Sequence, residues 1–306
     1  MNATSPHLVL LGPTASGKTS CALRFAQEHH LEIVNCDSMQ VYRGLEIGTA
    51  QPTQQEQTAV PHHLIAFLDI HQPYDVNLFL EAIRPVLADI EHRGGRALIV
   101  GGTGLYARAL VYGHTLLPAN PEIAQRLQRE FQQPGGQQVL AQRLLTFTRD
   151  PDSIPPDTLV NPRRLLRACE ILELTGKPPW ELHPKQTTPD SRFRQICLLP
   201  EFDSLKVRIR LRTMQMLHNG WITEAERVIQ EGLLETPTAR QALGYRDIAD
   251  FLQGHSRAHN QDELAELLSN RTIQYARRQY TWFRHQHPGA IAVSTASEAA
   301  SVMEQI

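Results

Sequence analysis

The sequence predicts an α/β protein in which a small all-helical domain is inserted into a core with a parallel sheet. Three observations support this class. Short apolar runs end at glycine or aspartate, helical patterns separate them, and the strand-like runs stop between about residues 118 and 190 while helical patterns continue. Apolar strands that alternate with helices are typical of a parallel sheet covered on both faces.

The elements of the first part can be placed from the spacing of their apolar residues. Predicted strands are short apolar runs, and predicted helices repeat apolar residues every three or four positions. In chain order these elements are a strand at 7–11, a helix at 18–29, a strand from 33 to 37, a helix at 76–93 and a strand at 97–100.

The middle of the chain is rich in Pro and Gln. Prolines separate three helical patterns, at 122–133, 137–148 and 162–174, and a strand at 194–199 is expected to return to the sheet. We therefore predict a core in two segments, 1–117 and 191–306, with a helical insertion at 118–190 between them. From residue 203 helices dominate, and the last dozen residues are expected to be weakly ordered.

Composition narrows the class of protein further. The chain has 306 residues, 41% hydrophobic, and a formal net charge of −2, which excludes a charged disordered chain and a histone-like basic protein. The four cysteines lack CxxC spacing, which argues against a zinc site or disulfide scaffold and fits a reducing compartment. Without a cleavable leader or an apolar run of about 18 residues, we expect a cytoplasmic protein with no membrane partner.

The strongest motif is GPTASGKT at residues 12–19, which fits G-x-x-x-x-G-K-[ST] between a predicted strand and a predicted helix. Backbone N–H groups of such a loop converge on phosphate oxygens, and Lys18 adds a cation. Thr19 is expected to bind Mg²⁺. The motif predicts a P-loop NTPase-like core with a polyphosphate site rather than an empty glycine-rich turn. Its residues are Gly12, Pro13, Thr14, Ala15, Ser16, Gly17, Lys18 and Thr19.

Asp37 follows the second predicted strand and has two possible roles. The sequence has no N-K-x-D element to read guanine, and the polar Asn35 makes EIVNCD a poor match to the Mg²⁺-binding strand of a motor-type ATPase. From these residues alone, Asp37 is either a Mg²⁺ ligand of a kinase-like site or a base that acts on an acceptor. His62-His63 is interpreted as structural, because neighbours on a strand point oppositely and cannot readily share a metal.

Segments after the loop carry a family resemblance. They are DSMQVYRG at 37–44, IGTAQP at 47–52, VPHHL at 60–64, VGGTGLY at 100–106, NPRRL at 161–165, QALGYR at 241–246, and YARRQ with TWFR between 275 and 284. In this order they resemble the signatures of tRNA dimethylallyltransferases, also called isopentenyl-tRNA transferases. The resemblance covers roughly residues 8–284.

The resemblance implies a prenyl transfer. A dimethylallyl group would pass from dimethylallyl diphosphate to N6 of adenine 37, next to the anticodon of tRNAs that read codons starting with U, giving N6-(dimethylallyl)adenosine. The P-loop would then hold a diphosphate leaving group. By the family match Asp37 is the base, while Lys18, Thr19 with Mg²⁺, and Arg212 stabilise the charge that develops as the C1–O bond breaks.

Arg212 belongs to the helical pattern that starts near residue 203. An apolar stripe of Val207, Leu211, Met214 and Leu217 runs along this pattern. Arg208, one turn before Arg212, is interpreted as a solvated surface residue.

The tRNA anticodon stem-loop is the expected macromolecular partner of a monomeric enzyme. Asn161 and Pro162 predict a helix start, and the arginines in its first turns oppose the helix dipole unless an external anion such as RNA phosphate lies there; pairing with Glu170 is the alternative. The expected contacts are Asp37, Ser38, Met39, Gln40, Thr103, Arg163, Arg164, Arg167, Gln241, Ala242, Leu243, Gly244, Tyr245 and Arg246.

Other positions near the expected RNA surface are ambiguous. Arg271, Tyr275, Arg278 and Trp282 follow 4-3-4 spacing, which suits either a basic-aromatic RNA surface or helix packing. Ala124 and Ile273 depart from the family pattern. They stand where many members have an arginine and a Thr-Arg pair, so no tRNA contact is expected from either.

Three other functions are compatible with the sequence. An adenylate prenyltransferase would use a free nucleotide as acceptor and would have no need of the helical insertion and basic segments. A small-molecule P-loop kinase would release ADP. A non-catalytic RNA-binding module would carry a vestigial loop, which the joint presence of Lys18, Thr19 and Asp37 disfavours.

Overall fold

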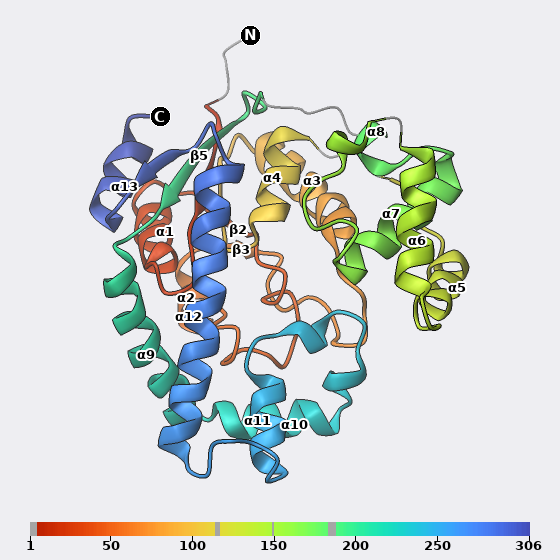
Figure 1. Ribbon diagram of the computed structural model, residues 1–306. Helices are drawn as coiled ribbons and strands as arrows, with labels where there is room; N and C mark the ends of the chain where they lie inside the picture. The colour runs from red at the N-terminus through yellow and green to blue at the C-terminus, as the bar shows by residue number, and fades with distance from the viewer. Residues whose placement is uncertain (1–4, 114–116, 149, 183–187) are drawn as a thin grey trace. The chain divides into compact units, whose positions relative to one another are not determined.

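The computed structural model describes residues 5–113, 117–148, 150–182 and 188–306 (Figure 1). The chain divides into two compact units. One comprises Met1–Tyr112 with Thr188–Ile306, and the other is Gly113–Thr187. The first unit contains the sheet, and the described residues of the second form helices and turns without a strand.

The sheet of the first unit has six strands in the order β3-β2-β4-β1-β5-β6, and each recorded pairing is parallel. The strands are β1 (His7–Leu11), β2 (Glu32–Asn35), β3 (His62–His63), β4 (Ala97–Gly101), β5 (Phe193–Leu198) and β6 (Ile291–Val293). The segments expected at 7–11, 33–37, 97–100 and 194–199 are therefore strands of one parallel sheet, as predicted.

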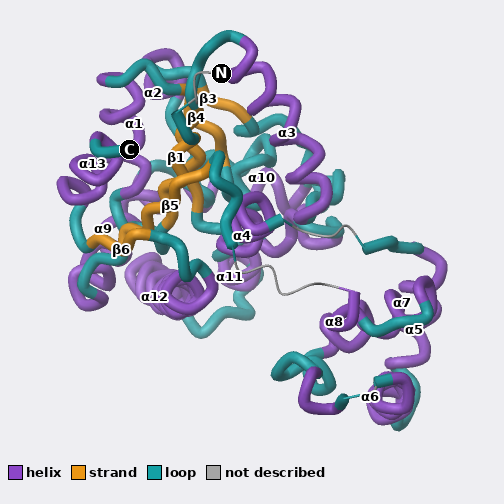
Figure 2. The backbone as a smooth tube through the Cα atoms, turned by 90° about the horizontal axis from the view of Figure 1, so that it is seen from above, coloured by secondary structure: helices purple, strands orange, loops and turns teal. Residues whose placement is uncertain are grey.

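Helices of the first unit cover both faces of this sheet (Figure 2). The helices of this unit are α1 (Lys18–Glu28), α2 (Gln54–Ala59), α3 (Val76–His92), α4 (Gly104–Tyr112), α9 (Phe202–His218), α10 (Trp221–Gln230), α11 (Tyr245–Leu252), α12 (Gln261–Gln286) and α13 (Ala296–Glu304), with short 3₁₀ turns at Leu233–Glu235 and Ala239–Gln241. The fold class predicted from the sequence is confirmed.

The core is split between the two faces because side chains alternate along a strand. Leu8 and Leu10 of β1 pack in a cluster with residues of α1 and α13. Val9 and Leu11 belong to the other cluster, with residues of α3 and α4. All five residues of β1 are buried, as expected for the central strand of a doubly covered sheet.

The C-terminal segment differs from the expectation. Residues 291–293 add the edge strand β6, and helix α13 follows with Ala299 and Met303 buried against the α1 face of the sheet. The prediction of weak order was wrong because this segment packs on α1, whose Cys21 lies 275 residues before the contacted Ala296.

The second unit has its own small core. Its helices are α5 (Pro121–Phe131), α6 (Gly136–Phe147), α7 (Pro162–Thr175) and α8 (Pro179–Leu182), with a 3₁₀ turn at Pro151–Ser153. Leu127, Leu140, Leu144 and Leu165 are fully buried in this core. The side chain of Asn161 accepts hydrogen bonds from the N–H groups of Arg163 and Arg164, so it caps α7 as predicted.

Candidate active site at the carboxyl edge of the sheet

The P-loop leaves the carboxyl end of β1 and ends in the first turn of α1. Gly17 caps that helix with a φ of 93°, a left-handed conformation that suits glycine. No hydrogen bond within the described part of the chain engages the N–H groups of Gly17, Lys18 and Thr19. Unpaired N–H groups at a helix N-terminus form an anion site.

Two cations, Lys18 of the loop itself and Arg212 of α9, lie at this loop. Lys18 donates to the carbonyl of Pro13 at 3.3 Å, and protein atoms crowd its ammonium so that desolvation lowers its pKa to about 8, against the opposing effect of Asp37. Arg212 donates to the hydroxyl of Thr14 at 3.1 Å, and burial lowers its pKa. A diphosphate bound here would restore the solvation that these cations lose.

Arg208 is exposed, as its interpretation as a surface residue implies, but it also bonds the P-loop. Its guanidinium donates to the carbonyl of Ser16 at 3.1 Å, so α9 holds the P-loop at two points one helical turn apart. Of the predicted apolar stripe of α9, only Leu217 lies on the buried face of the helix. Val207, Leu211 and Met214 are exposed, whereas the buried face consists of Leu205, Ile209, Thr213 and Leu217.

Asp37 lies at the next carboxyl end, just after β2. Its carboxylate oxygen Oδ1 accepts the N–H of Met39 at 3.0 Å, and its own N–H donates to the side chain of Asn35. A methyl group on Gly102, in the loop after β4, would lie 3.4 Å from the other carboxylate oxygen, Oδ2. Hydrogen bonds within its own turn therefore hold Asp37, and its oxygen Oδ2 lies near Gly102, in the loop that follows β4.

The loops after β2 and β4 are joined by hydrogen bonds. The hydroxyl of Thr103 accepts the N–H of Ser38 at 3.0 Å, and the N–H of Thr103 donates to the carbonyl of Cys36. Gln40 donates to the carbonyls of Thr49 and Ala50 and so stabilises its own segment. The structure brings Asp37, Ser38 and Thr103 together beside the P-loop.

Two residues of α12 complete the surroundings and were missed as site residues. Tyr275 lies near Asp37, and its pKa is raised by burial first and by the carboxylate charge second. Gln279 is buried and bonds both the P-loop and the loop after β4. In the sequence both belong to the YARRQ segment, and Tyr275 also belongs to the 4-3-4 stripe.

The 4-3-4 stripe is not one exposed surface. Arg271 pairs with Asp247 at 3.4 Å, the guanidinium of Arg278 lies over the Tyr275 ring, and Trp282 packs against the main core. Ile273 packs against a small cluster that includes Ala15 of the P-loop. Arg271 and Arg278 are exposed and Tyr275 and Trp282 are partly buried, so the stripe combines exposed basic residues with aromatic residues that pack.

The QALGYR segment helps to hold the loop that contains Ile47 and Gly48. Ala242 and Tyr245 are buried, and the Tyr245 hydroxyl donates to Glu224 at 2.7 Å. Glu224 in turn accepts the N–H groups of Ile47 and Gly48 at 2.7 and 2.8 Å. Arg246 is exposed.

The basic helix start lies in the second unit. Arg167 pairs with the nearly buried Glu170 at 2.7 Å and donates to the carbonyl of Leu117, while Arg164 donates to the carbonyl of Pro156. Arg163 and Arg164 are exposed. The alternative of pairing with Glu170 is realised for Arg167.

The described residues hold no group of three His, Cys, Asp or Glu side chains able to bind a metal ion by themselves. His63 instead contacts Glu32 at 2.7 Å. Within the described ranges, none of the helices combines the length and apolarity needed to span a lipid bilayer.

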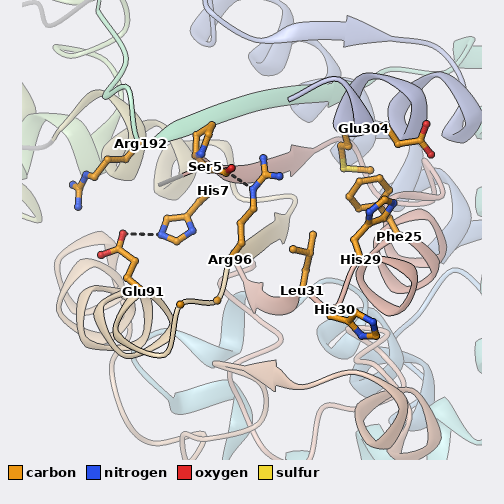
Figure 3. Close-up of a pocket in the computed structure, with 14 residues that line it drawn as sticks. Ser5, His7, Phe25, His29, His30, Leu31, Glu91, Arg96, Arg192 and Glu304 are labelled. Atoms are coloured by element: carbon orange, nitrogen blue, oxygen red, sulfur yellow. Dashed lines mark hydrogen bonds and ion pairs between the residues drawn. The ribbon is translucent and has the colours of Figure 1, made fainter. Parts of the chain in front are cut away.

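A cavity of 470 Å³ lies at the opposite edge of the sheet, where the strands begin (Figure 3). His7, Arg96 and Arg192 line it, and His7 contacts Glu91 at 2.9 Å. None of the predicted site residues lines this cavity, so it is separate from the candidate active site.

A parallel sheet whose first strand runs into a glycine-rich loop and a helix defines a P-loop protein, with its anion site at the switch point of the sheet. Two family models match the chain, one described as IPP transferase over residues 40–286 and one described as isopentenyl transferase over residues 6–66. The tRNA dimethylallyltransferase of Thermus thermophilus is 38% identical over 299 residues, which cover 96% of this chain and 94% of that protein. The chain belongs to the tRNA dimethylallyltransferase family.

Other relatives and solved structures agree with this family. The tRNA dimethylallyltransferase of Deinococcus radiodurans is 36% identical over 295 residues, 95% of this chain and 94% of that protein. The tRNA isopentenylpyrophosphate transferase of Bacillus halodurans superimposes with a TM-score of 0.69 at 31% identity, covering 98% of this chain and 96% of that one. A eukaryotic dimethylallyltransferase acting on tRNA gives a TM-score of 0.80 at 25% identity, covering 98% and 77%. The family resemblance found in the sequence is confirmed.

Proposed function

We propose that this chain transfers the dimethylallyl group of dimethylallyl diphosphate to N6 of adenine 37 in tRNAs that read codons starting with U, releasing diphosphate. Membership of the tRNA dimethylallyltransferase family makes it a prenyltransferase. The acceptor atom, the anticodon stem-loop as the recognised part of the tRNA and the monomeric state are our proposals.

One observation carries the proposal most directly. A side chain at residue 102 would begin 3.4 Å from Asp37 Oδ2 and 3.7 Å from the carbonyl oxygen of Gly12, so Gly102 lies between the carboxylate and the P-loop to which Arg212 donates. A base on one side and an anion cradle on the other is the arrangement that a transfer from a diphosphate to an amine requires.

The residues have separable roles in this reaction. The C1–O bond of the donor breaks, and its electron pair leaves with the diphosphate, where Lys18, Arg212 and the unpaired N–H groups of the loop stabilise the added charge. The new bond joins C1 to N6 of the adenine. Because the lone pair of that amine is delocalised, Asp37 accepts an N6 proton as attack proceeds, and the adenine must be turned out of its stack to reach it.

A divalent metal, which we propose is Mg²⁺, fits the loop only together with the diphosphate. Thr19 presents an exposed hydroxyl in the first turn of α1, and no described cluster of carboxylates would hold the ion alone. Mg²⁺ commonly binds through few protein oxygens plus substrate phosphates. When bound it would neutralise part of the diphosphate charge.

The tRNA contacts follow from the exposed members of the predicted set. We propose that Arg163, Arg164 and Arg246 contact RNA phosphates, and that Ser38 and Thr103 lie near the acceptor nucleotide. The buried Tyr245 would act on RNA affinity through the loop that it supports. Each lost phosphate contact should lower the salt dependence of tRNA binding by about one unit of slope.

The test is transfer of label from radiolabelled dimethylallyl diphosphate, with Mg²⁺, to bulk tRNA and, in a parallel tube, to AMP. Label at an adenine beside the anticodon supports the proposal. Label only in AMP would assign the chain to free nucleotides, and ATP-dependent phosphorylation without label in either would indicate a kinase.

The base role has its own variant. Asp37→Ala should abolish transfer of the dimethylallyl group but still bind both dimethylallyl diphosphate and tRNA. The control is Asp262→Ala, which changes an exposed acidic residue in the first turn of α12 and should leave transfer unchanged. Near-normal turnover of Asp37→Ala would refute the assignment of Asp37 as the base.

A further inference from the structure

Gln279 joins two loops of the site that come from different strands. Its side-chain oxygen accepts the N–H of Thr14 at 2.9 Å, and its side-chain nitrogen donates to the carbonyl of Gly102 at 2.9 Å. Because an N–H only donates and a carbonyl only accepts, these partners fix the orientation of the amide. Gln279 is 7% exposed, so water does not readily replace either bond.

Each bonded loop holds one side of the proposed reaction. Thr14 belongs to the P-loop, and its hydroxyl is also held by Arg212. Gly102 precedes Thr103, whose hydroxyl accepts the N–H of Ser38, the residue after Asp37. The hydrogen bonds therefore run from the anion cradle through Gln279 to the loop that carries the base.

The hydrogen bond to Thr14 also determines which N–H groups of the P-loop remain free to bind the diphosphate. With its N–H engaged by Gln279, Thr14 is not available to an oxygen of the diphosphate. The N–H groups of Gly17, Lys18 and Thr19 have no such partner within the described part of the chain. The diphosphate is thereby directed toward the N-terminus of α1.

We propose that Gln279 is a positioning residue that sets the distance between the diphosphate cradle and the acceptor side of the site. This inference rests on the proposed function. Gln279 acts through the two loops without touching the reacting atoms. Since a misplacement of about 1 Å can cost about 100-fold in rate, losing both bonds should lower kcat by about 10- to 100-fold.

The first test removes the amide group of residue 279 with a side chain of similar length. Gln279→Met should lower kcat for tRNA prenylation by about 10- to 100-fold, while the Kd for inorganic diphosphate changes less than about threefold. Gln261→Met, an exposed glutamine at the start of the same helix, is the matched control and should behave as the unaltered chain. An unchanged kcat, or a loss of diphosphate affinity as large as the loss of kcat, would overturn the proposal.

The second test separates positioning from packing and does not depend on how well the methionine variant folds. In Gln279→Glu, the protonated carboxyl can accept from Thr14 and donate to Gly102, whereas the ionised form cannot donate. Its kcat divided by that of the unaltered chain should therefore rise as pH falls. The neighbouring charged groups Asp37, Lys18 and Arg212, and the phenol of Tyr275, are common to both proteins, so their effect on kcat largely cancels in the ratio.

A ratio independent of pH would refute the positioning role. Failure of the proposed function looks different, because then the unaltered chain itself would leave tRNA unlabelled.

Discussion

The buried carboxylate of Glu224 permits a quantitative prediction. Its two oxygens accept the N–H groups of Ile47 and Gly48 and the hydroxyl of Tyr245, at 2.7 to 2.8 Å, and the residue is 7% exposed. Tyr245→Phe removes one bond to this charge and leaves both N–H groups satisfied. A hydrogen bond to a charged group contributes about 1.5–3 kcal/mol, so the free energy of unfolding should fall by that amount.

Glu224→Gln tests the other side of the same contact. In this variant an amide nitrogen replaces one of the two carboxylate oxygens, and each of those oxygens accepts a hydrogen bond in the unaltered chain. A backbone N–H or the Tyr245 hydroxyl therefore loses its acceptor, which costs about 1–3 kcal/mol. In this background the bond of Tyr245 is between neutral groups. Adding Tyr245→Phe should then cost only about 1 kcal/mol, a coupling that a double-mutant cycle measures.

Urea denaturation at pH 7 supplies these free energies, and filter binding at fixed salt supplies the Kd for tRNA. Tyr280→Phe, at a partly exposed tyrosine, should shift the free energy of unfolding by less than about 0.5 kcal/mol. The reasoning fails if Tyr245→Phe leaves stability unchanged but weakens tRNA binding directly. That outcome would make the Tyr245 hydroxyl an RNA contact.

Three further outcomes are expected. Burial holds the pKa of Lys18 at about 8, so affinity for inorganic diphosphate should fall as pH rises above 8, by up to about tenfold per unit, and this component should be absent in Lys18→Met. Burial lowers the pKa of His287 to about 4. Between pH 6.5 and 4 the unfolded chain therefore takes up a proton that the folded chain does not. The free energy of unfolding measured in urea should fall over this interval, and should fall less in His287→Gln. In Gly102→Ala the new methyl group would lie 2.6 Å from the Gln279 amide nitrogen, so kcat should drop at least about tenfold with diphosphate binding retained, and full activity would show that the loop yields freely.

Local patterns predicted the parts of the fold whose signals lie within one segment. The strand, loop and helix around residues 7–29 and the cap of α7 at Asn161 are specified by neighbouring residues, and the structure contains them. The P-loop motif predicted the glycine-rich loop with its unpaired N–H groups for the same reason, since one continuous segment supplies them, whereas Arg212 comes from the distant helix α9.

Contacts between distant segments were not predictable in this way. Helix α9 has apolar residues on two faces, and packing against α12 buries Leu205 and Ile209 and leaves Val207 and Leu211 exposed. Neither face is distinguishable in the sequence alone.

The same limitation applies within the site. Arg208 bonds a residue 192 positions away, and Gln279 bonds one 265 positions away. A polar side chain on a helix has no local feature that reveals such a partner. The roles of Asp37 and Arg212 came from the family resemblance for this reason.

The central position of β1 has a consequence for synthesis of the protein. Leu8 is made well before its neighbours in the sheet, because it pairs with Leu98 on one side and Arg194 on the other, and α13 packs on its face. Pairing over such separations is slow, and it leaves apolar surface open in the meantime. The strand that leads into the P-loop is therefore made before the segments that enclose it, and its apolar side chains stay accessible until those segments have been synthesised.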